Sequence, residues 1–395
     1  MLFDAASPDL SISTPSLAPG PAPLSPPAEA VRAARALAPR LFAQAAATDA
    51  EATFPGQEFA WLRAAGLLTA PLAPALGGAG LGAPAATEAL LDVLRHVGRG
   101  NLAVGRLYEG HVNALLLIQL YGHAAQLQGW AADAAAGRLF GVWNTEDPAQ
   151  GVRLEPLPGG RYRLFGAKTF ASGAGYVHRP LVTGALAEGH GWQMFVLPAD
   201  AQAPALDRSF WRPLGMRATA SYRADLTGLE IGPADLLGPP NAYYRQPWFG
   251  GGASRFAAVQ MGGAEAVFDE TRRFLQRLGR TDDPYQRQRL GQMALLRESG
   301  RQWLRGAAAR AALPADAAAG PQPAAAAYAG LVRTAIEQIG LAMLPLAERC
   351  VGARGLLQPE PFERLHRDLT HYLRQPAPDA VLADVGRFVL DGHDF

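Results

Sequence analysis

The chain lacks several features that define common protein classes. It contains a single cysteine, Cys350, and its eight histidines never fall in an HxxxH or HExxH spacing. Neither a disulfide within the chain nor a metal site is therefore expected. No segment offers the ~20 uninterrupted apolar residues of a membrane helix, and the N-terminus lacks a basic region followed by an apolar run. We expect a protein of the reducing cytoplasm that does not enter a membrane.

The balanced charge and the lack of certain glycine motifs exclude further classes of protein. Basic and acidic residues balance at 36 and 35, and no basic stripe is interleaved with aromatics, so nucleic acid is not an expected partner. No phosphate-binding GxxxxGK(S/T) loop and no GxSxG hydrolase elbow occur. Residues 77–82 have the glycine spacing of a dinucleotide motif, but a loop broken by prolines precedes them instead of a strand. The chemistry must therefore come from another part of the chain.

The order of helix-like and strand-like sequence predicts an α+β fold with several domains. Residues 1–27 are rich in Pro, Ser and Ala and are expected to form a flexible arm. Residues 28–140 and residues 250–395 are dominated by strong helix formers with helical periodicity. Residues 141–240 contain closely spaced strand-like runs without intervening helices, which predicts an antiparallel β domain.

Residues 141–184 are the part of the chain richest in candidate site residues. This segment combines short polar side chains, glycines and aromatic rings on predicted strands. An isoalloxazine ring needs an apolar wall and hydrogen bonds to its pyrimidine edge and N5, so these side chains suit a flavin-binding shelf. The alternative is a hairpin core in which Phe170 is buried and Ser172 satisfies the backbone.

A series of short motifs follows a fixed order over about residues 30–390. They occupy residues 61–68, 74–80, 144–146, 166–172, 214–218, 254–255, 352–355 and 364–368. Each motif alone is weakly specific, but in this order they resemble the acyl-CoA dehydrogenase superfamily.

The resemblance implies an architecture and an activity. The family has an N-terminal helical domain, a middle β domain and a C-terminal four-helix bundle, and it binds FAD between the β domain and the helices as a homotetramer or homodimer. Its activity is α,β-dehydrogenation of an acyl-CoA, with hydride transfer to flavin N5. We therefore expect an FAD-dependent oxidoreductase of this type, with electron-transfer flavoprotein or a flavin reductase as a partner protein.

By the same resemblance, the shelf residues receive roles toward the flavin. Thr145 and the main chain around Val142 and Asn144 would contact the pyrimidine edge. Phe170 would pack on the ring, and Ser172 would donate a hydrogen bond near N5 and O4. These five residues are the expected ring-binding set.

The residues expected at the phosphate and adenine end depart from the family pattern. Arg280 matches an arginine that usually comes from a neighbouring subunit, but the Phe-Gly of that motif is missing. Arg349 stands where the family has Gln, and Gly352 lies in the glycine step that follows. A cationic Arg349 could pair with phosphate, while a surface ion pair is the alternative for both arginines. FMN is therefore an open alternative to FAD.

The catalytic base of the family is missing. Pro376 occupies one position where the family places a Glu, and Ser254 occupies the other. Neither side chain is a competent general base near neutral pH without an activating partner. Glu109 and Asp379 are candidates for a relocated base, and His111 on a predicted helix is a third candidate.

Three explanations remain open at this point. The chain could be an acyl-CoA dehydrogenase with a relocated base, which is the reading we prefer. It could resemble the monooxygenase branch of the superfamily, which takes reduced flavin from a separate reductase and reacts it with O2. It could also bind acyl groups or flavin without turnover. His111, Arg255 and Gln375 are the expected substrate contacts, with His111 otherwise a satisfied helix-face histidine.

Overall fold

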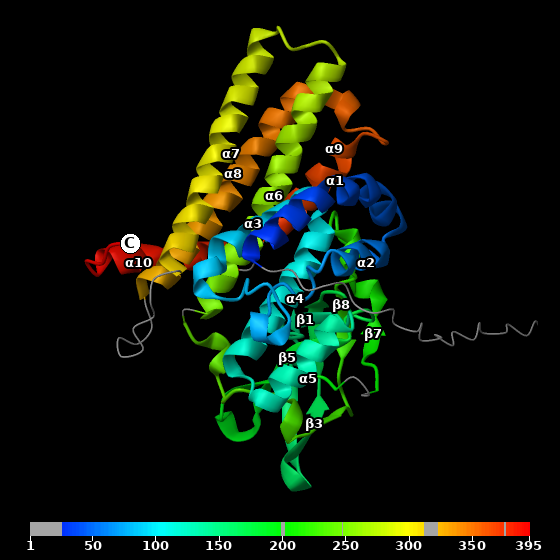
Figure 1. The fold of residues 1–395 in the computed structure, drawn as a ribbon, viewed down its shortest axis with the longest axis vertical. Helices are drawn as coiled ribbons and strands as arrows, with labels where there is room; N and C mark the ends of the chain where they lie inside the picture. Colours follow the sequence, from blue (N-terminus) through cyan, green and yellow to red (C-terminus); the bar gives the residue numbers. More distant parts are fainter. Residues whose placement is uncertain (1–25, 199–201, 247, 312–322, 375–376) are drawn as a thin grey trace, which may run out of the picture.

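This computed structural model describes residues 26–198, 202–246, 248–311, 323–374 and 377–395. The predicted arm, residues 1–27, lies outside the described residues except for its last two. The strands occupy one end of the molecule, the long C-terminal helices rise at the other, and most of the N-terminal helices lie between them (Figure 1). The three-part architecture expected for the chain is therefore confirmed.

The N-terminal part is helical. Its first helix has a proline at the first helical position. Proline has no backbone N–H, and an N–H at this position would have no acceptor within the helix, so proline fits well here. The fourth begins at an Asn101 side chain that accepts the backbone N–H of Ala103 at 3.0 Å. The helices are α1 (Pro27–Glu51), α2 (Gly56–Ala64), α3 (Thr87–Gly100), α4 (Leu102–Tyr121) and α5 (Ala124–Ala135).

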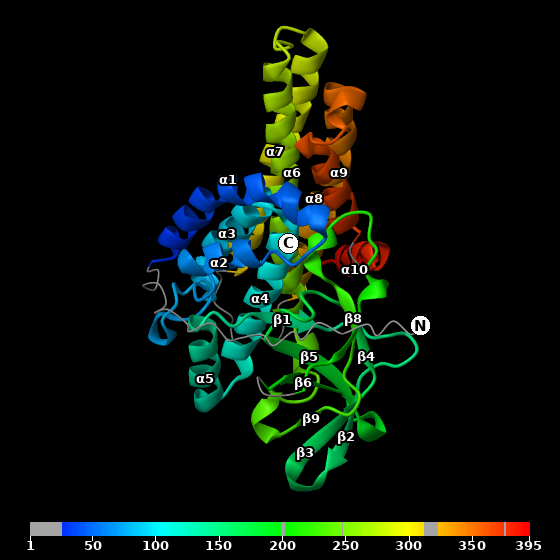
Figure 2. The same cartoon turned by 90° about the vertical axis from the view of Figure 1, so that its right-hand side faces the viewer.

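The described residues of the C-terminal part form five helices, of which α6 to α9 pack side by side as a bundle (Figure 2). All but the first begin with a proline, which is pre-organised for the first helical turn. The last helix lies across the base of the bundle against α8. The helices are α6 (Trp248–Arg277), α7 (Pro284–Ala311), α8 (Pro323–Gly355), α9 (Pro361–Tyr372) and α10 (Pro378–Leu390). None of the described helices is long and apolar enough to cross a membrane.

Glycines join the N-terminal helices closely to the bundle. A Cβ on Gly262 of α6 would lie 2.1 Å from the carbonyl oxygen of Arg95 on α3, and a Cβ on Gly98 would lie 2.4 Å from the carbonyl of Val259. The two backbones therefore touch where the helices cross. Arg95 Nη1 and Glu265 form an ion pair of 2.7 Å across the same crossing, so packing and charge fix one orientation.

The strands that the structure describes in the β domain form two sheets. The larger has the order β10-β6-β5-β2-β3-β9 with β1 also on β5, and the smaller has the order β4-β8-β7. Their bounds are β1 (Phe140–Trp143), β2 (Arg153–Leu157), β3 (Arg161–Phe165), β4 (Ala167–Ala171), β5 (Arg179–Leu186), β6 (Trp192–Val196), β7 (Ala205–Asp207), β8 (Tyr222–Asp225), β9 (Glu230–Ile231) and β10 (Leu236–Leu237).

The expectation of a purely antiparallel sheet is wrong at two pairings. β1 and β2 both run parallel to β5, with Phe140 opposite Arg179 and Leu154 opposite Leu186. The eight-residue β5 is longer than either partner, so the two short strands share one of its edges end to end. The chain between them leaves the sheet after Trp143 and returns at Arg153. This excursion carries two of the expected flavin-binding residues, Asn144 and Thr145.

Candidate functional site

Cross-strand contacts join the two segments expected to form the flavin shelf. The indole N–H of the buried Trp143 donates to the carbonyl of Ser172 at 3.1 Å. The backbone N–H of Thr169 donates to the carbonyl of Thr145 at 3.0 Å. The chain leaving β1 is therefore held against β4. The structure brings the five expected ring-binding residues together, and their contact with a flavin stays a prediction.

Phe170 has an unusual conformation for a strand residue. Its φ is +49°, a region that disfavours side chains with a Cβ, and the pairing of β4 with β8 shifts register at the same place. The ring is 51% exposed and makes edge contacts with Phe210 and Trp211, with centroids 5.2 and 6.1 Å away. The hairpin-core alternative for Phe170 is therefore wrong, because the strand bulges to present the ring outward.

A chain of hydroxyl groups ends at Ser172. Its Oγ lies 2.9 Å from the Oγ of Ser221, which lies 2.8 Å from the Oγ1 of Thr219, and Thr219 donates to the carbonyl of Met216 at 2.9 Å. Each hydroxyl has one proton. When Ser221 donates to Ser172, the hydroxyl of Ser172 donates to the carbonyl of Phe170 at 3.5 Å, a length at which the bond is weak, so a ligand acceptor would compete with that carbonyl for the proton.

Lys168 lies directly beneath the shelf. It is fully buried, and its Nζ donates to the carbonyl of Asn144 at 3.3 Å and to Thr183 Oγ1 at 3.1 Å, and forms an ion pair with Glu146. Burial lowers the pKa of Lys168 to about 8, and Glu146 opposes this shift. Asn144 Oδ1 accepts from Thr183 at 2.7 Å and from the hydroxyl of Tyr244 at 3.3 Å. In the sequence, Lys168 is one residue of a motif and has no assigned role. The structure shows that its ammonium group positions Asn144.

The chemistry of this surface fits a flavin ring. Phe170 offers an exposed apolar face, Ser172 a hydroxyl proton, and Asn144 an amide at a half-buried place. An isoalloxazine ring requires this combination of an apolar wall with donors at its polar edge. The residues that would hold the ring are Val142, Asn144, Thr145, Phe170 and Ser172.

A polar stripe interrupts the largely apolar helix α4 beside the shelf. Arg106, Glu109 and Asn113 share one face at i, i+3 and i+7. Arg106 Nη1 donates to one oxygen of Glu109 at 2.6 Å, and the amide of Asn113 donates to the other. From α6, the Nε of Arg255 donates to the side-chain oxygen of Asn113. Sequence reasoning missed Arg106 and Asn113, although their helical spacing with Glu109 in an apolar helix is a readable signal.

His111 does not face a pocket, so its expected roles toward substrate and proton are corrected. It is fully buried, its Nδ1 accepts the backbone N–H of Phe140 at 3.1 Å, and its Nε2 donates to the carbonyl of Leu68 at 2.8 Å. Burial lowers its pKa to about 4. Both ring nitrogens are used in joining α4 to β1 and to the loop after α2. The satisfied-histidine alternative describes this residue.

The other candidates for a base gain no support. Glu109 is 3% exposed, and Arg106 and Asn113 occupy its carboxylate. Ser254 is buried on α6 and has no carboxyl group. Asp379 is exposed in the first turn of α10. Gln375 and Pro376 lie outside the described residues.

The residues expected at the phosphate and adenine end lie far from the shelf of the same chain. α6 has 30 residues, a length of about 45 Å, and Arg280 follows its distal end. Arg349 and Gly352 are exposed on α8, where Gly352 interrupts the helical geometry. Within one chain these residues do not meet the shelf. Any role toward the flavin would require a neighbouring subunit and stays a prediction.

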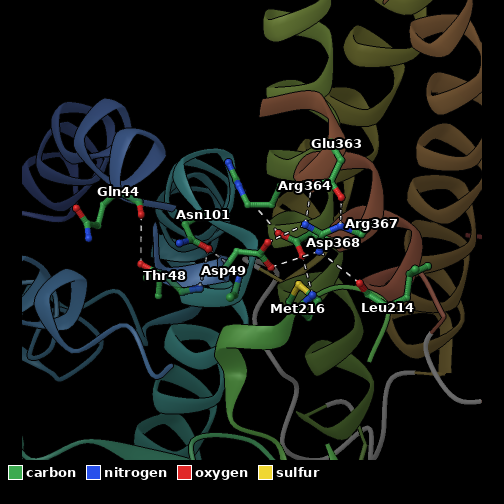
Figure 3. A network of polar contacts seen from close by, with 12 residues as sticks. Gln44, Thr48, Asp49, Asn101, Leu214, Met216, Glu363, Arg364, Arg367 and Asp368 are labelled. Atoms are coloured by element: carbon green, nitrogen blue, oxygen red, sulfur yellow. Dashed lines mark hydrogen bonds and ion pairs between the residues drawn. The ribbon is translucent and has the colours of Figure 1, made fainter. Parts of the chain in front are cut away.

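Two of the ordered motifs form a single contact that supports the shelf (Figure 3). The carboxylate of Asp368 on α9 accepts the backbone N–H of Met216, and Arg367 donates to the carbonyl of Leu214 at 3.3 Å. Arg367 also pairs with Asp49 of α1 at 2.7 Å. The segment that leads to Ser221 is thereby anchored on two helices.

The sequence of this chain is similar to those of known proteins. The family profile described as "Acyl-CoA dehydrogenase, N-terminal domain" matches residues 28–138. Dibenzothiophene monooxygenase of Rhodococcus erythropolis is 26% identical over 398 residues, covering 92% of this chain and 93% of the relative. The probable FMNH2-dependent monooxygenase SfnC of Pseudomonas putida is 26% identical over 394 residues, covering 93% and 96%.

Solved structures show the same fold. FMN-bound TdsC from Paenibacillus sp. A11-2 has a TM-score of 0.82 at 20% identity, covering 92% of this chain and 98% of that one. Butyryl-CoA dehydrogenase from Megasphaera elsdenii has a TM-score of 0.79 at 16% identity, with the same coverage. At these identities the likeness shows the architecture.

The preferred reading as an acyl-CoA dehydrogenase is wrong. The curated relatives that match nearly the whole chain are monooxygenases, and the described residues offer no free carboxylate at Ser254 or Glu109 for removing an α-proton. The fold implied by the motifs is confirmed, and the expected reaction is not. Residues 28–138 therefore match the acyl-CoA dehydrogenase N-terminal family model, and the relatives that the chain resembles over nearly its whole length are monooxygenases.

Proposed function

We propose that this chain is the oxygenase component of a two-component monooxygenase that uses reduced FMN and O2. The observation that carries this proposal is the match over more than nine-tenths of its length to dibenzothiophene monooxygenase and to an FMNH2-dependent monooxygenase. A separate flavin reductase would supply the reduced flavin. FMN is favoured over FAD because Arg280 and Arg349 depart from the family pattern at the adenine end and because one relative is named as FMNH2-dependent.

The reaction balances with the parts that this site would hold. When bound, reduced flavin supplies the two electrons that let one atom of O2 enter the organic substrate while the other leaves as water. The residues have three tasks. Lys168 holds the main chain of Asn144, Ser172 donates a hydrogen bond at the polar edge of the ring, and Phe170 covers the ring. The rings of Phe210 and Trp211 extend this apolar cover and reduce access of water.

The homo-oligomer remains part of the proposal. Arg280, Arg349 and Gly352 lie at the distal end of the bundle, where only another copy of the chain could bring them to a flavin. The substrate is a small organic molecule, and the sulfur heterocycle in the name of one relative is a reasonable first compound to assay.

The test is an anaerobic reconstitution followed by exposure to oxygen. Purified protein is loaded with FMN or FAD, reduced, and mixed with O2 in a stopped-flow spectrometer. We expect tight retention of reduced FMN, an oxygen-dependent transient distinct from oxidised flavin, and product only when a reductase is present. Anaerobic acyl-CoA should leave the absorbance of oxidised flavin unchanged. Bleaching by acyl-CoA, or failure to retain either flavin, would overturn the proposal.

A matched pair of variants connects this test to the shelf. Ser172→Ala removes the hydroxyl expected at the flavin edge, and Ser209→Ala removes an exposed hydroxyl that bonds only to Asp207. We expect Ser172→Ala to shorten the oxygen-dependent transient and to lower coupled product formation roughly tenfold, since a hydrogen bond to a developing charge is worth about 1.5–3 kcal/mol. Ser209→Ala should behave like the wild type. Equal behaviour of both variants would show that the shelf is misplaced.

A further inference from the structure

The polar stripe of α4 and Arg255 form a charged cluster that the proposed reaction does not itself require. It contains the guanidinium groups of Arg106 and Arg255 and a single carboxylate, Glu109, so it carries an excess of one positive charge. Arg106 is 31% exposed at its side chain, whereas Glu109 is 3% exposed. The carboxylate is therefore enclosed, whereas Arg106 and Arg255 are both half-buried. Such an arrangement attracts an anion.

Arg255 is the less compensated of the two cations. Its Nε donates to the side-chain oxygen of Asn113, and among the described residues its terminal nitrogens have no hydrogen-bond acceptor. Burial lowers the pKa of Arg255, and the nearby Glu109 and Tyr243 only partly oppose this shift. A half-buried guanidinium whose terminal nitrogens are not used gains most from a ligand that supplies two acceptor oxygens.

Two independent contacts place this cluster beside the flavin shelf. A Cβ on Gly110 would lie 3.9 Å from Arg106 Nη1 and 3.9 Å from both Gly141 Cα and Val142 N, so the guanidinium faces the start of the shelf across a glycine. The 3-10 helix η8 (Ala242–Tyr244) provides the second contact. The ring of Tyr244 reaches Asn144 of the shelf, and its neighbour Tyr243 lies in the field of Glu109 and both arginines.

We propose that Arg106 and Arg255 bind the oxyanion end of the organic substrate, a carboxylate, sulfinate or sulfonate, and thereby direct its other end to the shelf. The substrate class rests on the proposed monooxygenase function, whereas anion binding at this place does not. The planar guanidinium of Arg255 matches two oxygens of such a group. The amide of Asn113 orients this guanidinium, because its NH2 donates to Glu109 and its oxygen accepts from Arg255.

Flavin phosphate is the other oxyanion that could reach this cluster. A phosphate bound here would place the arginines at the ribityl end of the flavin, with the substrate elsewhere. The substrate anion is favoured because Gly110 and Tyr244 connect the cluster to Val142 and Asn144, which are expected at the ring itself. The two sources predict different behaviour of FMN and riboflavin.

The test begins with binding to the wild-type protein without flavin or O2. Benzenesulfinate and its neutral analogue methyl phenyl sulfone are titrated by calorimetry. We expect benzenesulfinate to bind roughly tenfold to a hundredfold more tightly, as charge-assisted hydrogen bonds to an arginine pair predict. Equal affinity, or tighter binding of the sulfone, would overturn the proposal. Because no turnover is measured, this result is separate from failure of the monooxygenase function.

Charge variants then locate the binding. Arg106→Gln and Arg255→Gln should each lower the affinity for benzenesulfinate tenfold or more and leave the sulfone unchanged, while the exposed Arg245→Gln serves as the matched control. Glu109→Gln should raise the affinity for benzenesulfinate several-fold because it removes the one opposing charge. A decrease in the Glu109→Gln variant would contradict the proposal, and this variant remains informative if loss of Arg255 prevents folding.

The affinities for FMN and riboflavin show whether the cluster binds the substrate anion or the flavin phosphate. If the cluster binds substrate, Arg255→Gln leaves the ratio of FMN to riboflavin affinity unchanged, and benzenesulfinate and FMN bind together. If it binds flavin phosphate, the variant lowers that ratio tenfold or more and the sulfinate competes with FMN. The second outcome would overturn the assignment to substrate.

Discussion

The carboxylate of Asp368 accepts a hydrogen bond from the backbone N–H of Met216 at 2.6 Å, across 152 residues of sequence. Met216 has a φ of +60° and is almost fully buried, so this carboxylate holds a backbone that would otherwise be strained. Burial raises the pKa of Asp368, and Arg364 opposes the shift. Two sequence motifs that resemble the family separately are therefore two halves of one contact, which supports the segment that ends at Ser221.

Gly215 is expected to be the least replaceable residue of this contact. A Cβ there would lie 2.2 Å from the carbonyl oxygen of Arg367 and 2.6 Å from the backbone nitrogen of Asp368. Since both are backbone atoms, Gly215→Ala should lower the free energy of unfolding by about 2–3 kcal/mol, measured by denaturant titration. Gly291→Ala in the exposed part of α7 meets nothing within 4 Å and should stabilise by about 0.5–1 kcal/mol. A neutral Gly215→Ala would contradict this close approach.

Replacing Phe170 with glycine should affect stability and FMN binding in opposite directions. Its φ of +49° suits glycine better than a side chain with a Cβ, and its exposed ring adds little to the core. Phe170→Gly should therefore keep or raise the free energy of unfolding by up to about 1 kcal/mol, while weakening FMN binding roughly three- to tenfold through loss of ring contact.

Ala52 provides the matched control for Phe170. It is exposed at the end of α1 with the same φ of 49°, so Ala52→Gly should change stability in the same direction without affecting FMN binding. Calorimetry of FMN binding and thermal unfolding of both variants distinguish the two effects. Unchanged FMN affinity in Phe170→Gly would remove this residue from the flavin shelf.

Lys168 is the single lysine of the chain, and arginine should not replace it. Its Nζ is fully enclosed and bonds Asn144, Thr183 and Glu146, so the larger planar guanidinium has no room. Lys168→Arg should lower the free energy of unfolding by about 1–3 kcal/mol and weaken retention of FMN, because Asn144 loses its position. Arg245→Lys on the surface should change neither. Wild-type stability and FMN retention in Lys168→Arg would refute the positioning role.

Acid should destabilise the protein in part through His111. Its pKa is lowered from 6.5 to about 4 by burial, so the unfolded chain binds a proton that the folded chain excludes. The contribution of His111 is complete above pH 6.5 and is lost as the pH falls toward 4, a total of about 3 kcal/mol. His111→Gln retains a donor and an acceptor and should flatten the stability curve in this window. His190→Gln, which is exposed, should leave it unchanged, and a parallel curve for both variants would exclude this role.

Much of the fold could be predicted from local sequence. The helices of residues 28–140 and of the C-terminal part follow from periodicity, strong helix formers and prolines at helix starts, and the β domain follows from closely spaced strands. These signals act over a few residues, so a single sequence contains them. The exact domain boundaries remain predictions. Parallel pairing of β1 and β2 with β5 could not be read, because strand partners are chosen by packing between distant segments.

The sequence by itself determined the order of helical and β parts, the family resemblance, and the segment expected to contact flavin, since these depend on local pattern and motif order. Only the tertiary structure decided how the polar groups are used. His111 is a structural residue because its partners Leu68 and Phe140 lie 43 and 29 residues away. Arg106 became a site residue because Arg255, 149 positions further along the chain, folds onto the same helix face. Burial and pairing, which set the charge and reach of each group, exist only after distant segments have packed.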